Sequence, residues 1–222
     1  MKVAVIPARS GSMELAHKNL SVVGGKSLLN RAIDFSIESN LFDKIIVTTD
    51  YCEHLFYREG IEVRHRPEAL ATSRATMVEV LADVIETFGL ATEDKIVLLQ
   101  PTSPFRVFED LVKVLELMEE YDSVITVKEL EYNSALFVTP ISDTELESKQ
   151  VEACQTNRQE QPKHYYPNGN LFGVRVGTFC QTQSFYGGTL GYVLQKGKCN
   201  IDINHKDDLL FAQFLGQQDE EE

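Results

Sequence analysis

The stretch KVAVIPARSGSMELAHKN, residues 2–19, decides the fold. It begins with Lys2–Ile6, a short apolar run of the kind found in buried strands. The chain then passes directly into a loop that contains an arginine, a glycine and serines, at residues 9–12. Open parallel sheets bind ligands beyond the carboxyl ends of their strands. The stretch therefore predicts a first strand that ends at a ligand-binding edge.

The residue types in this loop suit phosphate. Ser10, Gly11 and Ser12 can offer backbone N–H groups and hydroxyls to phosphate oxygens, and Arg9 and Lys18 can strengthen those hydrogen bonds by charge. The loop is neither a GxGxxG nor a Walker A sequence, because the later GGKS lacks the earlier glycine and a preceding strand. The residues alone leave two interpretations open: a phosphate-binding loop, and an ordinary connection between a strand and a helix.

Strand and helix patterns alternate in the first half of the chain. Short apolar runs, several of them rich in β-branched residues, predict strands at 44–49, 62–65, 95–99 and 123–127. Apolar residues at helical spacing predict helices at 28–39, 75–88 and 108–118. This alternation favours an α/β fold with a mainly parallel sheet and helices on both faces.

The pattern changes after about residue 129. We expect 130–167, which is mostly polar, to be a loop or hairpin used for contacts. Regular structure is expected again at 170–176 and 189–194, followed by a last helix at 205–214. The acidic tail 216–222 is expected to be a frayed, solvated end.

The composition limits the classes of function. A chain of 222 residues suits one domain, and no apolar run approaches the roughly 20 residues of a membrane span. The net charge of −13 argues against nucleic acid or an anionic membrane as the main partner. Residues 1–31 nevertheless hold five cations and one carboxylate, which suits a small polyanionic ligand. The four cysteines are scattered, so we expect reduced thiols in a soluble, cytoplasmic protein.

Two other segments carry polar residues beside predicted strands. KIVLLQPTSPFR, residues 95–106, places Gln100 and Arg106 past the end of a strand, so Gln100 is expected to face the same crevice as Arg9. A proline-stiffened turn is the alternative. In NIDIN, residues 200–204, Asp202 is either a ligand of a divalent cation or a helix cap or surface carboxylate. A helix cap is expected at Asp50.

Taken together, these segments resemble the acylneuraminate cytidylyltransferase family, the CMP-sialic acid synthetases. The family's motifs occur here in order, as IPARSGSMELAHKN, GGKSLLNRAI, the RP and ALATSRAT elements, LLQPTSPFR, an RQ…P…Y…NG pattern from Arg158 to Gly169, and IDIN at 201–204. The resemblance implies a Rossmann-like nucleotide-diphospho-sugar transferase fold with three α/β/α layers, and a single domain over 1–222. It also implies a homodimer in which 130–167 is a dimerisation and sugar-site insertion.

The reaction implied by the resemblance joins CMP from CTP to an acidic nine-carbon sugar, with Mg²⁺, and releases pyrophosphate. The implied catalytic residues are Arg9, Lys18 and Asp202, and the implied metal ligands are Asp202 and Asn204. The implied nucleotide-binding residues are Ala8, Arg9, Ser10, Gly11, Ser12, Lys18, Asn19, Arg66 and Ala75. The implied sugar-binding residues are Gln100, Thr102, Ser103, Arg158, Gln159 and Phe172.

The chain departs from the family pattern at three positions. Met13 replaces a loop lysine, Asn204 replaces an aspartate, and Phe172 replaces a tyrosine. These changes are compatible with a subfamily that uses a different nonulosonic acid, or with a catalytically weakened nucleotide-binding paralogue. A 3-deoxy-manno-octulosonate cytidylyltransferase is the alternative enzyme, because it shares the fold and the reaction.

Overall fold

The computed structural model describes residues 1–11, 14–130, 138–142, 144–148 and 163–221. Its main feature is a seven-stranded sheet with the order β11-β7-β10-β6-β1-β4-β5. The strands are β1 (Lys2–Ala8), β4 (Lys44–Thr49), β5 (Glu62–His65), β6 (Lys95–Leu98), β7 (Ser123–Glu129), β10 (Tyr165–Arg175) and β11 (Leu190–Leu194). Only β10 runs antiparallel to its neighbours, β6 and β7. The prediction of a mainly parallel sheet is confirmed.

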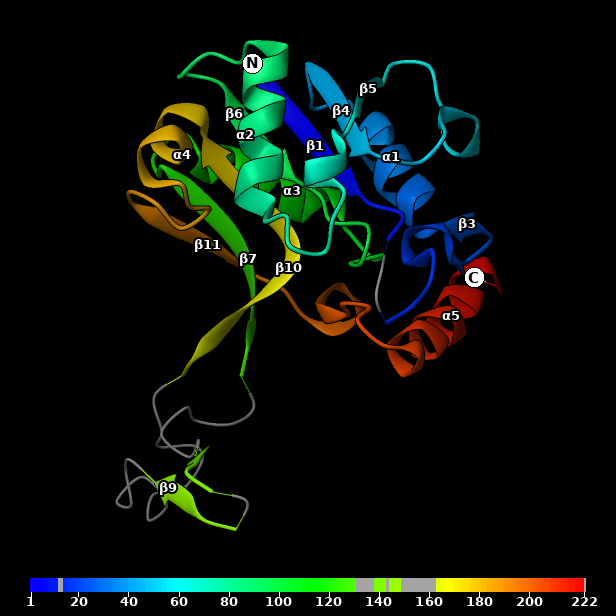
Figure 1. The fold of residues 1–222 in the computed structure, drawn as a ribbon, viewed down its shortest axis with the longest axis vertical. Helices are drawn as coiled ribbons and strands as arrows, with labels where there is room; N and C mark the ends of the chain where they lie inside the picture. Colours follow the sequence, from blue (N-terminus) through cyan, green and yellow to red (C-terminus); the bar gives the residue numbers. More distant parts are fainter. Residues whose placement is uncertain (12–13, 131–137, 143, 149–162, 222) are drawn as a thin grey trace.

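Helices cover both faces of this sheet, because side chains along a strand alternate between the faces (Figure 1). In β1, Ala4 and Ile6 pack with α1 (Leu28–Ser39) and α3 (Phe108–Leu117). The intervening Val3 and Val5 belong to a second core with α2 (Met77–Phe88) and α4 (Val176–Thr182). The result is the three-layer α/β/α arrangement that the sequence predicts. Short 3₁₀ helices lie between these elements: η1 (Lys18–Leu20), η2 (Glu53–Leu55), η3 (Glu68–Leu70) and η7 (Gly197–Asn200).

A smaller third core holds the last helix against the body. The hairpin of β2 (Val22–Val23) and β3 (Lys26–Ser27) contacts α5 (Lys206–Glu221), and Val23 and Ala212 are fully buried there. The helix continues through Glu221, past its predicted end at 214, so this end is helical rather than frayed. Gln217 and Gln218 are exposed, as expected of a solvated end. Gly216 itself is buried by a close backbone approach: a Cβ added there would lie 2.8 Å from the backbone nitrogen of Gly24.

The segment between β7 and β10 differs in part from its prediction. β10 begins at Tyr165, which pairs with Glu129, so the sheet resumes earlier than residue 170. The paired strands β7 and β10 form a ribbon that extends from the body of the molecule (Figure 1). A small hairpin of β8 (Val138–Pro140) and β9 (Leu146–Ser148) lies beyond the far end of this ribbon. Among the described residues, no helix has the length and apolar character needed to cross a membrane.

Candidate active site

The first candidate pocket, called the strand-end pocket below, lies where β1 and β6 end. The two strands are parallel neighbours, and Val5 of β1 pairs with Leu98 of β6, so the residues that follow them meet at one edge. The pocket has a volume of about 230 Å³. It is lined by Pro7, Arg9, Lys18, Asn19, Arg66, Ala75, Met77, Val80, Gln100, Pro101 and Thr102. The expectation that Gln100 and Arg9 face one crevice is confirmed.

Backbone carbonyls hold two of the cations in this pocket. The Arg9 Nη1 donates to the Thr72 carbonyl over 2.8 Å, and the Lys18 Nζ donates to the Ile203 carbonyl over 2.9 Å. Asn19 is buried and donates its side-chain amide to the Arg9 carbonyl over 2.9 Å. Since carbonyls are neutral, these contacts fix the positions of the cations without cancelling their charge. The arrangement suits an anionic ligand.

Arg66 adds a third cation with spare hydrogen-bonding capacity. Its Nε donates to the Thr48 hydroxyl over 3.1 Å, while its Nη2 is buried with no hydrogen-bond partner. Burial lowers the pKa of Arg66 to about 10, and the charge of Arg9 acts in the same direction. The guanidinium is still protonated at neutral pH. A buried donor without a partner is costly, so an acceptor on a ligand would relieve that cost.

The glycine-containing loop after β1 is anchored by Asp50, which was expected to cap a helix. The backbone N–H and hydroxyl of Ser10 donate to the two Asp50 carboxylate oxygens over 2.7 and 2.6 Å. The expectation that Asp50 caps a helix is therefore wrong, because its carboxylate reaches back to the β1 loop. Of the other predicted nucleotide-binding residues, Ala8 is buried within β1. Gly11 lies in open space, since a Cβ added there would meet nothing within 4 Å. Ser12 and Met13 lie outside the described residues.

A second and larger pocket, called the aromatic pocket below, lies beside the first. It has a volume of about 600 Å³. Its lining consists of Lys128, Tyr166, Pro167, Asn168, Gly169, Phe172, Tyr186, Asn200, Ile201, Asp202, Asn204, Asp208 and Phe211. The rings of Phe172 and Tyr186 meet edge to face with centroids 6.2 Å apart, and Lys128 lies 5.8 Å from the Tyr166 ring centroid.

The predicted sugar-binding residues are divided between these regions. Phe172 lines the aromatic pocket, whereas Gln100 and Thr102 line the strand-end pocket. Ser103 is fully buried and its hydroxyl has no hydrogen-bond partner. Arg158 and Gln159 lie outside the described residues. The sequence missed Lys128, Tyr166, Tyr186 and Phe211. Tyr166 lies inside the RQ…NG pattern but was not assigned a role, and the other three come from separate segments outside the quoted motifs.

Asp202 lies at the junction of the two pockets. It lines the aromatic pocket, and its charge acts on Lys18, which lines the strand-end pocket. Burial lowers the pKa of Lys18, and the negative charge of Asp202 partly opposes that shift. Its Oδ2 accepts a hydrogen bond from the Asn204 side-chain amide over 3.0 Å, and its buried Oδ1 has no partner. Asp202 is not the cap of α5, because Asp208 accepts from the Asn204 and His205 backbone N–H groups.

A buried polar network holds the turn between the pockets. The Thr126 hydroxyl donates to Asn168 Oδ1 over 2.7 Å, and Asn168 Nδ2 donates to Gln195 Oε1 over 2.6 Å. Gln195 in turn donates to Asp110 Oδ2 over 2.8 Å. These side chains are almost fully buried, and Gly169 follows with a φ of +83° that favours glycine. The network fixes the Asn168–Gly169 turn, and sequence patterns did not indicate it.

Within the described residues, no group of three His, Cys, Asp or Glu side chains could enclose a metal ion. Asp202 still fits Mg²⁺, because its buried Oδ1 has no hydrogen-bond partner and a carboxylate oxygen is a hard anionic ligand. Mg²⁺ commonly uses one or two protein carboxylates and completes its shell with substrate phosphates and water. The position between the cationic and aromatic pockets is compatible with that pattern.

The model of one protein family, described as cytidylyltransferase, matches residues 3–203. The chain belongs to the cytidylyltransferase family. Its relatives include the N-acylneuraminate cytidylyltransferase of Streptococcus agalactiae serotype V, which is 34% identical over 94% of this chain and 51% of its own length. The enzyme of the same name from Escherichia coli O18:K1:H7 is 31% identical, over 97% of this chain and 52% of its own length. The chain thus spans about half the length of these two relatives.

A shorter cytidylyltransferase relative matches along nearly its whole length. The CMP-N,N'-diacetyllegionaminic acid synthase of Legionella pneumophila is 27% identical over 99% of this chain and 97% of its own. Among solved structures, CMP-2-keto-3-deoxy-manno-octonic acid synthetase complexed with CTP has a TM-score of 0.70 at 16% identity, and the match covers 98% of this chain and 99% of that one. The structural match confirms the predicted fold class, and the family model and the sequence relatives confirm the resemblance inferred from the motifs.

Proposed function

We propose that this chain transfers CMP from CTP to a nonulosonic, sialic-type sugar acid and releases pyrophosphate. One observation carries the proposal: a pocket with three cations adjoins, at Asp202, a larger pocket lined by aromatic rings and Lys128. The first suits a triphosphate, and the second suits a bulky sugar with a carboxylate. The names of the sequence relatives support this pairing of substrates.

The roles follow from the positions of the side chains. Arg9, Lys18 and Asn19 hold the triphosphate, together with the loop at 10–12, and Arg66 and Ala75 lie beside the cytidine. Ser10 contributes only if it exchanges its contacts with Asp50 for a phosphate oxygen. The sugar occupies the aromatic pocket, with Phe172 and Tyr186 against its side chain and Lys128 available to its carboxylate.

The reaction is a displacement at phosphorus. The anomeric hydroxyl of the sugar forms a bond to the α-phosphorus, the bond from that phosphorus to the bridging oxygen breaks, and pyrophosphate leaves with that oxygen. The hydroxyl proton passes to water or to a phosphate oxygen. The chain contributes alignment across the two pockets and positive charge from Arg9 and Lys18 toward the developing negative charge.

We assign a Mg²⁺ site to Asp202 and Asn204. Oδ1 of Asp202 is free to bind the ion, and Asn204 can offer its side-chain oxygen while its amide nitrogen still donates to Asp202. When bound there, Mg²⁺ would supply charge to the α-phosphate and lower the pKa of the attacking hydroxyl. Asp202 also keeps Lys18 close by through their mutual attraction.

The proposal includes a homodimer. The ribbon of β7 and β10 carries residues away from the body, and Tyr165 and Tyr166 are exposed toward its far end, where they pair with the last residues of β7. In a dimer, 130–167 would reach the second copy, and Arg158 and Gln159 would contact the sugar bound there. Light scattering on the purified chain tests this part: a monomer at micromolar concentration that still turns over its substrates would contradict it.

The decisive measurement is pyrophosphate release from CTP and Mg²⁺ with a panel of sialic, legionaminic, pseudaminic and 3-deoxy-manno-octulosonic acids. We expect turnover with one of the nine-carbon acids and none with UTP or ATP in place of CTP. Turnover with octulosonic acid alone would favour the alternative enzyme. Intact CTP binding without turnover on any acid would identify a catalytically silent paralogue.

A further inference from the structure

A buried carboxylate in the first turn of α3, Asp110, lines neither the strand-end pocket nor the aromatic pocket. Its Oδ2 accepts from the Gln195 side-chain amide over 2.8 Å, and its Oδ1 lies 3.5 Å from the Lys113 Nζ. Gln195 follows β11 and is 85 residues away in sequence. Burial of a carboxylate is costly, and an apolar side chain would fill this position at lower cost. We therefore expect the carboxylate to do more than fill space.

The carboxylate sets the direction of the two amides that follow it. A carboxylate oxygen only accepts hydrogen bonds, whereas a side-chain amide can present either its oxygen or its nitrogen. Gln195 therefore turns its nitrogen to Asp110, and its Oε1 accepts from Asn168 Nδ2 over 2.6 Å. Asn168 in turn presents its Oδ1 to the Thr126 hydroxyl over 2.7 Å and to the Asn170 backbone N–H over 3.3 Å. Of Asp110, Gln195 and Asn168, only Asp110 has no donor to offer.

The directed Asn168 amide holds a segment on each side of Asp202. Its Nδ2 also donates to Asn200 Oδ1 over 2.9 Å, two residues before Asp202. On the other side, Gly169 follows Asn168, and a Cβ added at Gly169 would lie 3.9 Å from the Asp202 Cγ. A reversed Asn168 would turn its nitrogen toward the Asn170 backbone N–H, so that donor would lose its acceptor. The direction of the amide therefore bears on the position of Asp202.

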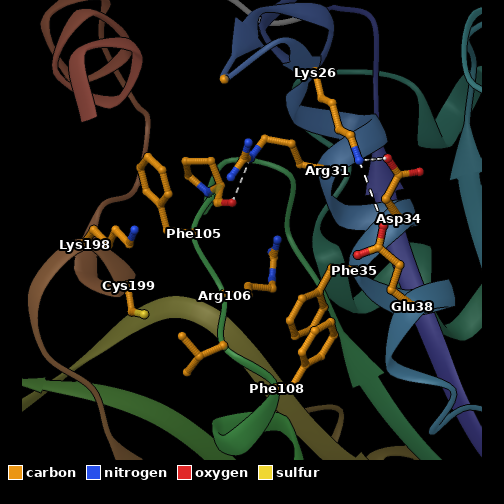
Figure 2. Close-up of a pocket in the computed structure, with 13 residues that line it drawn as sticks. Lys26, Arg31, Asp34, Phe35, Glu38, Phe105, Arg106, Phe108, Lys198 and Cys199 are labelled. Atoms are coloured by element: carbon orange, nitrogen blue, oxygen red, sulfur yellow. Dashed lines mark hydrogen bonds and ion pairs between the residues drawn. The ribbon is translucent and has the colours of Figure 1, made fainter. Parts of the chain in front are cut away.

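A second buried amide joins the same turn to the segments beside it. Asn170 Nδ2 donates to the carbonyls of Phe105 and Cys199 over 2.7 and 2.9 Å. Figure 2 shows both of these residues, Phe105 on the segment that leads from β6 to α3 and Cys199 on η7. The turn is thus tied to the chain that enters α3, which carries Asp110, and to η7, which leads to Asp202.

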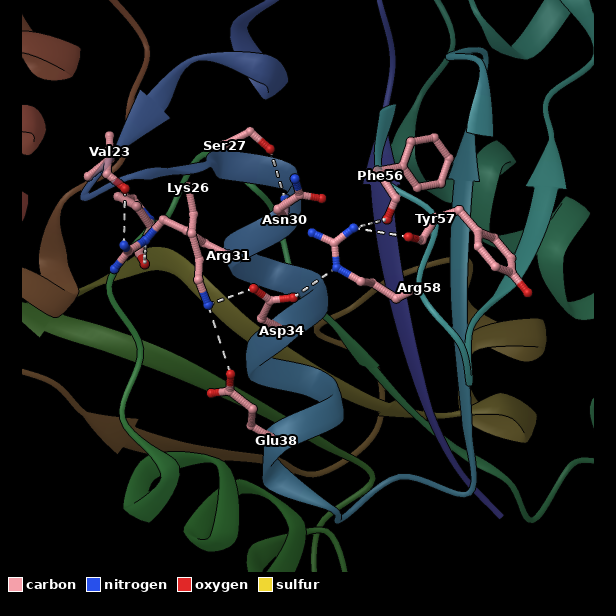
Figure 3. A network of polar contacts seen from close by, with 11 residues as sticks. Val23, Lys26, Ser27, Asn30, Arg31, Asp34, Glu38, Phe56, Tyr57 and Arg58 are labelled. Carbon is pink, nitrogen blue, oxygen red and sulfur yellow. Dashed lines mark hydrogen bonds and ion pairs between the residues drawn. The ribbon is translucent and has the colours of Figure 1, made fainter. Parts of the chain in front are cut away.

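A carboxylate on α1, Asp34, differs from Asp110 in what it holds. Asp34 is paired directly with cations, Lys26 at 2.7 Å and Arg58 at 3.6 Å (Figure 3). The side chains of Asp34 and Asp110 are similarly buried, at 17% and 12% exposed. Asp34 holds the charged ends of flexible side chains, whereas Asp110 holds an amide whose other end leads to the candidate active site. Asp34 therefore provides a control for the loss of a carboxylate without a change of amide direction.

We propose that Asp110 is a positioning residue for the candidate active site. It fixes the direction of the Gln195 and Asn168 amides, and through them the positions of the Asn168–Gly169 turn and of Asp202. It contacts neither substrate and acts only through these side chains. The kinetic consequence rests on the proposed function, whereas the direction of the amides does not.

Moving the carboxylate from position 110 to position 195 tests the proposal. Asp110→Asn can donate as well as accept, so the reversed arrangement becomes accessible. We expect kcat/KM for the sugar acid to fall about tenfold, as for other partners that orient an active-site ligand, with the KM for CTP unchanged. In the double variant Asp110→Asn, Gln195→Glu, the carboxylate at 195 accepts from the amide at 110 and still offers only acceptors to Asn168. We expect this variant to recover kcat/KM to within about threefold.

Amide hydrogen exchange of the full chain gives a readout that does not depend on turnover. Peptides that cover 168–172 and 199–204 should exchange faster in Asp110→Asn and return to their original rate in the double variant. Unchanged exchange in Asp110→Asn would overturn the proposal, as would a double variant that exchanges and turns over no better than Asp110→Asn alone. Absence of turnover with every sugar acid would contradict the proposed function, and the exchange rates would then decide the role of Asp110.

Glu109→Gln is the matched control for charge, because Glu109 is exposed in the same turn of α3. It should change neither kinetics nor exchange. Asp34→Asn is the control for stability, since it weakens the ion pairs with Lys26 and Arg58. We expect a lower Tm for Asp34→Asn, with both KM values and the exchange of 168–172 unchanged. An equal kinetic loss in Asp34→Asn and Asp110→Asn would show that stability alone is responsible and would overturn the proposal.

Discussion

The strand-end pocket and the aromatic pocket are built on different principles. In the strand-end pocket, Arg9 and Lys18 are held by backbone carbonyls from distant segments, so the pocket concentrates charge. In the aromatic pocket, the Asn168–Gly169 turn is held by buried side chains that bond to one another, so the pocket fixes a shape. The contrast teaches that binding of the nucleotide should depend on single charges, whereas recognition of the sugar should depend on a network.

The largest effect is expected for Arg9→Ala. Loss of a charged contact to phosphate costs about 1.5–3 kcal/mol, which corresponds to about one to two decades in kcat/KM for CTP. A second loss follows because the Arg9 side chain also holds the Thr72 carbonyl. We therefore expect CTP use to be abolished in a pyrophosphate-release assay, with the Tm little changed. Near-normal turnover would remove the triphosphate role from Arg9.

Asp202→Asn is expected to separate activity from stability. The substitution removes the anionic oxygen proposed for Mg²⁺, so turnover should fall about tenfold to a hundredfold. The Tm should stay level or rise, because the buried Oδ1 has no partner in the folded chain. Activity at graded Mg²⁺ concentrations and thermal unfolding measure the two effects.

Asp207→Asn is the control for Asp202→Asn, since Asp207 is exposed in the first turn of α5. It should change neither turnover nor the Mg²⁺ requirement. An Asp202→Asn chain that keeps full activity at low Mg²⁺ would break the assignment of the junction as a metal site.

Gln195→Leu tests the network that shapes the aromatic pocket. It leaves Asn168 Nδ2 and Asp110 Oδ2 without this partner, which should destabilise the chain by about 1–3 kcal/mol. The KM for the sugar acid should rise several-fold, while the KM for CTP stays unchanged, because Gln195 does not line the strand-end pocket. Steady-state kinetics with each substrate varied in turn measure this difference.

Gln181→Leu is the matched control, because Gln181 is exposed on α4. It should leave both KM values and the Tm unchanged. Equal increases in the two KM values for Gln195→Leu would mean that the two pockets are not held independently.

The smallest effect is expected for Asn204→Asp. A second carboxylate would add charge toward Mg²⁺, and it would also lose the amide that donates to Asp202 Oδ2. Because these effects oppose each other, turnover should be similar or higher. A collapse of activity would show that the Asn204 amide has a positive role of its own.

The predictable parts of the molecule are those encoded in contiguous patterns. β4 and α1 match their predicted ranges, because β-branched runs and helical spacing are local signals. Arg9 and Gln100 meet because each follows a parallel strand, and parallel neighbours end at one edge.

The unpredicted parts depend on partners that are distant in sequence. Asp50 looked like a helix cap, yet Ser10 reaches it from 40 residues away. The segment after 214 was expected to be frayed, yet it is helical and the backbone of Gly216 packs against Gly24. Asn168 is buried although it is polar, so β10 begins at Tyr165, before the predicted start at 170. The aromatic pocket combines residues of the NG and IDIN motifs with Lys128, Tyr186 and Phe211, which lie outside any quoted motif, and only the fold brings them together.

The reversed direction of β10 has a consequence for how this fold could diversify. Since β6 and β7 both point toward the ligand-binding edge, an antiparallel strand between them must start at that edge. Chain inserted just before β10 would therefore emerge beside the aromatic pocket, without lengthening any crossover that holds the sheet. The closure entropy of such an insertion grows only slowly with its length. Insertions in this one connection could then change the choice of sugar, while the strand-end pocket after β1 and β6 stays unchanged.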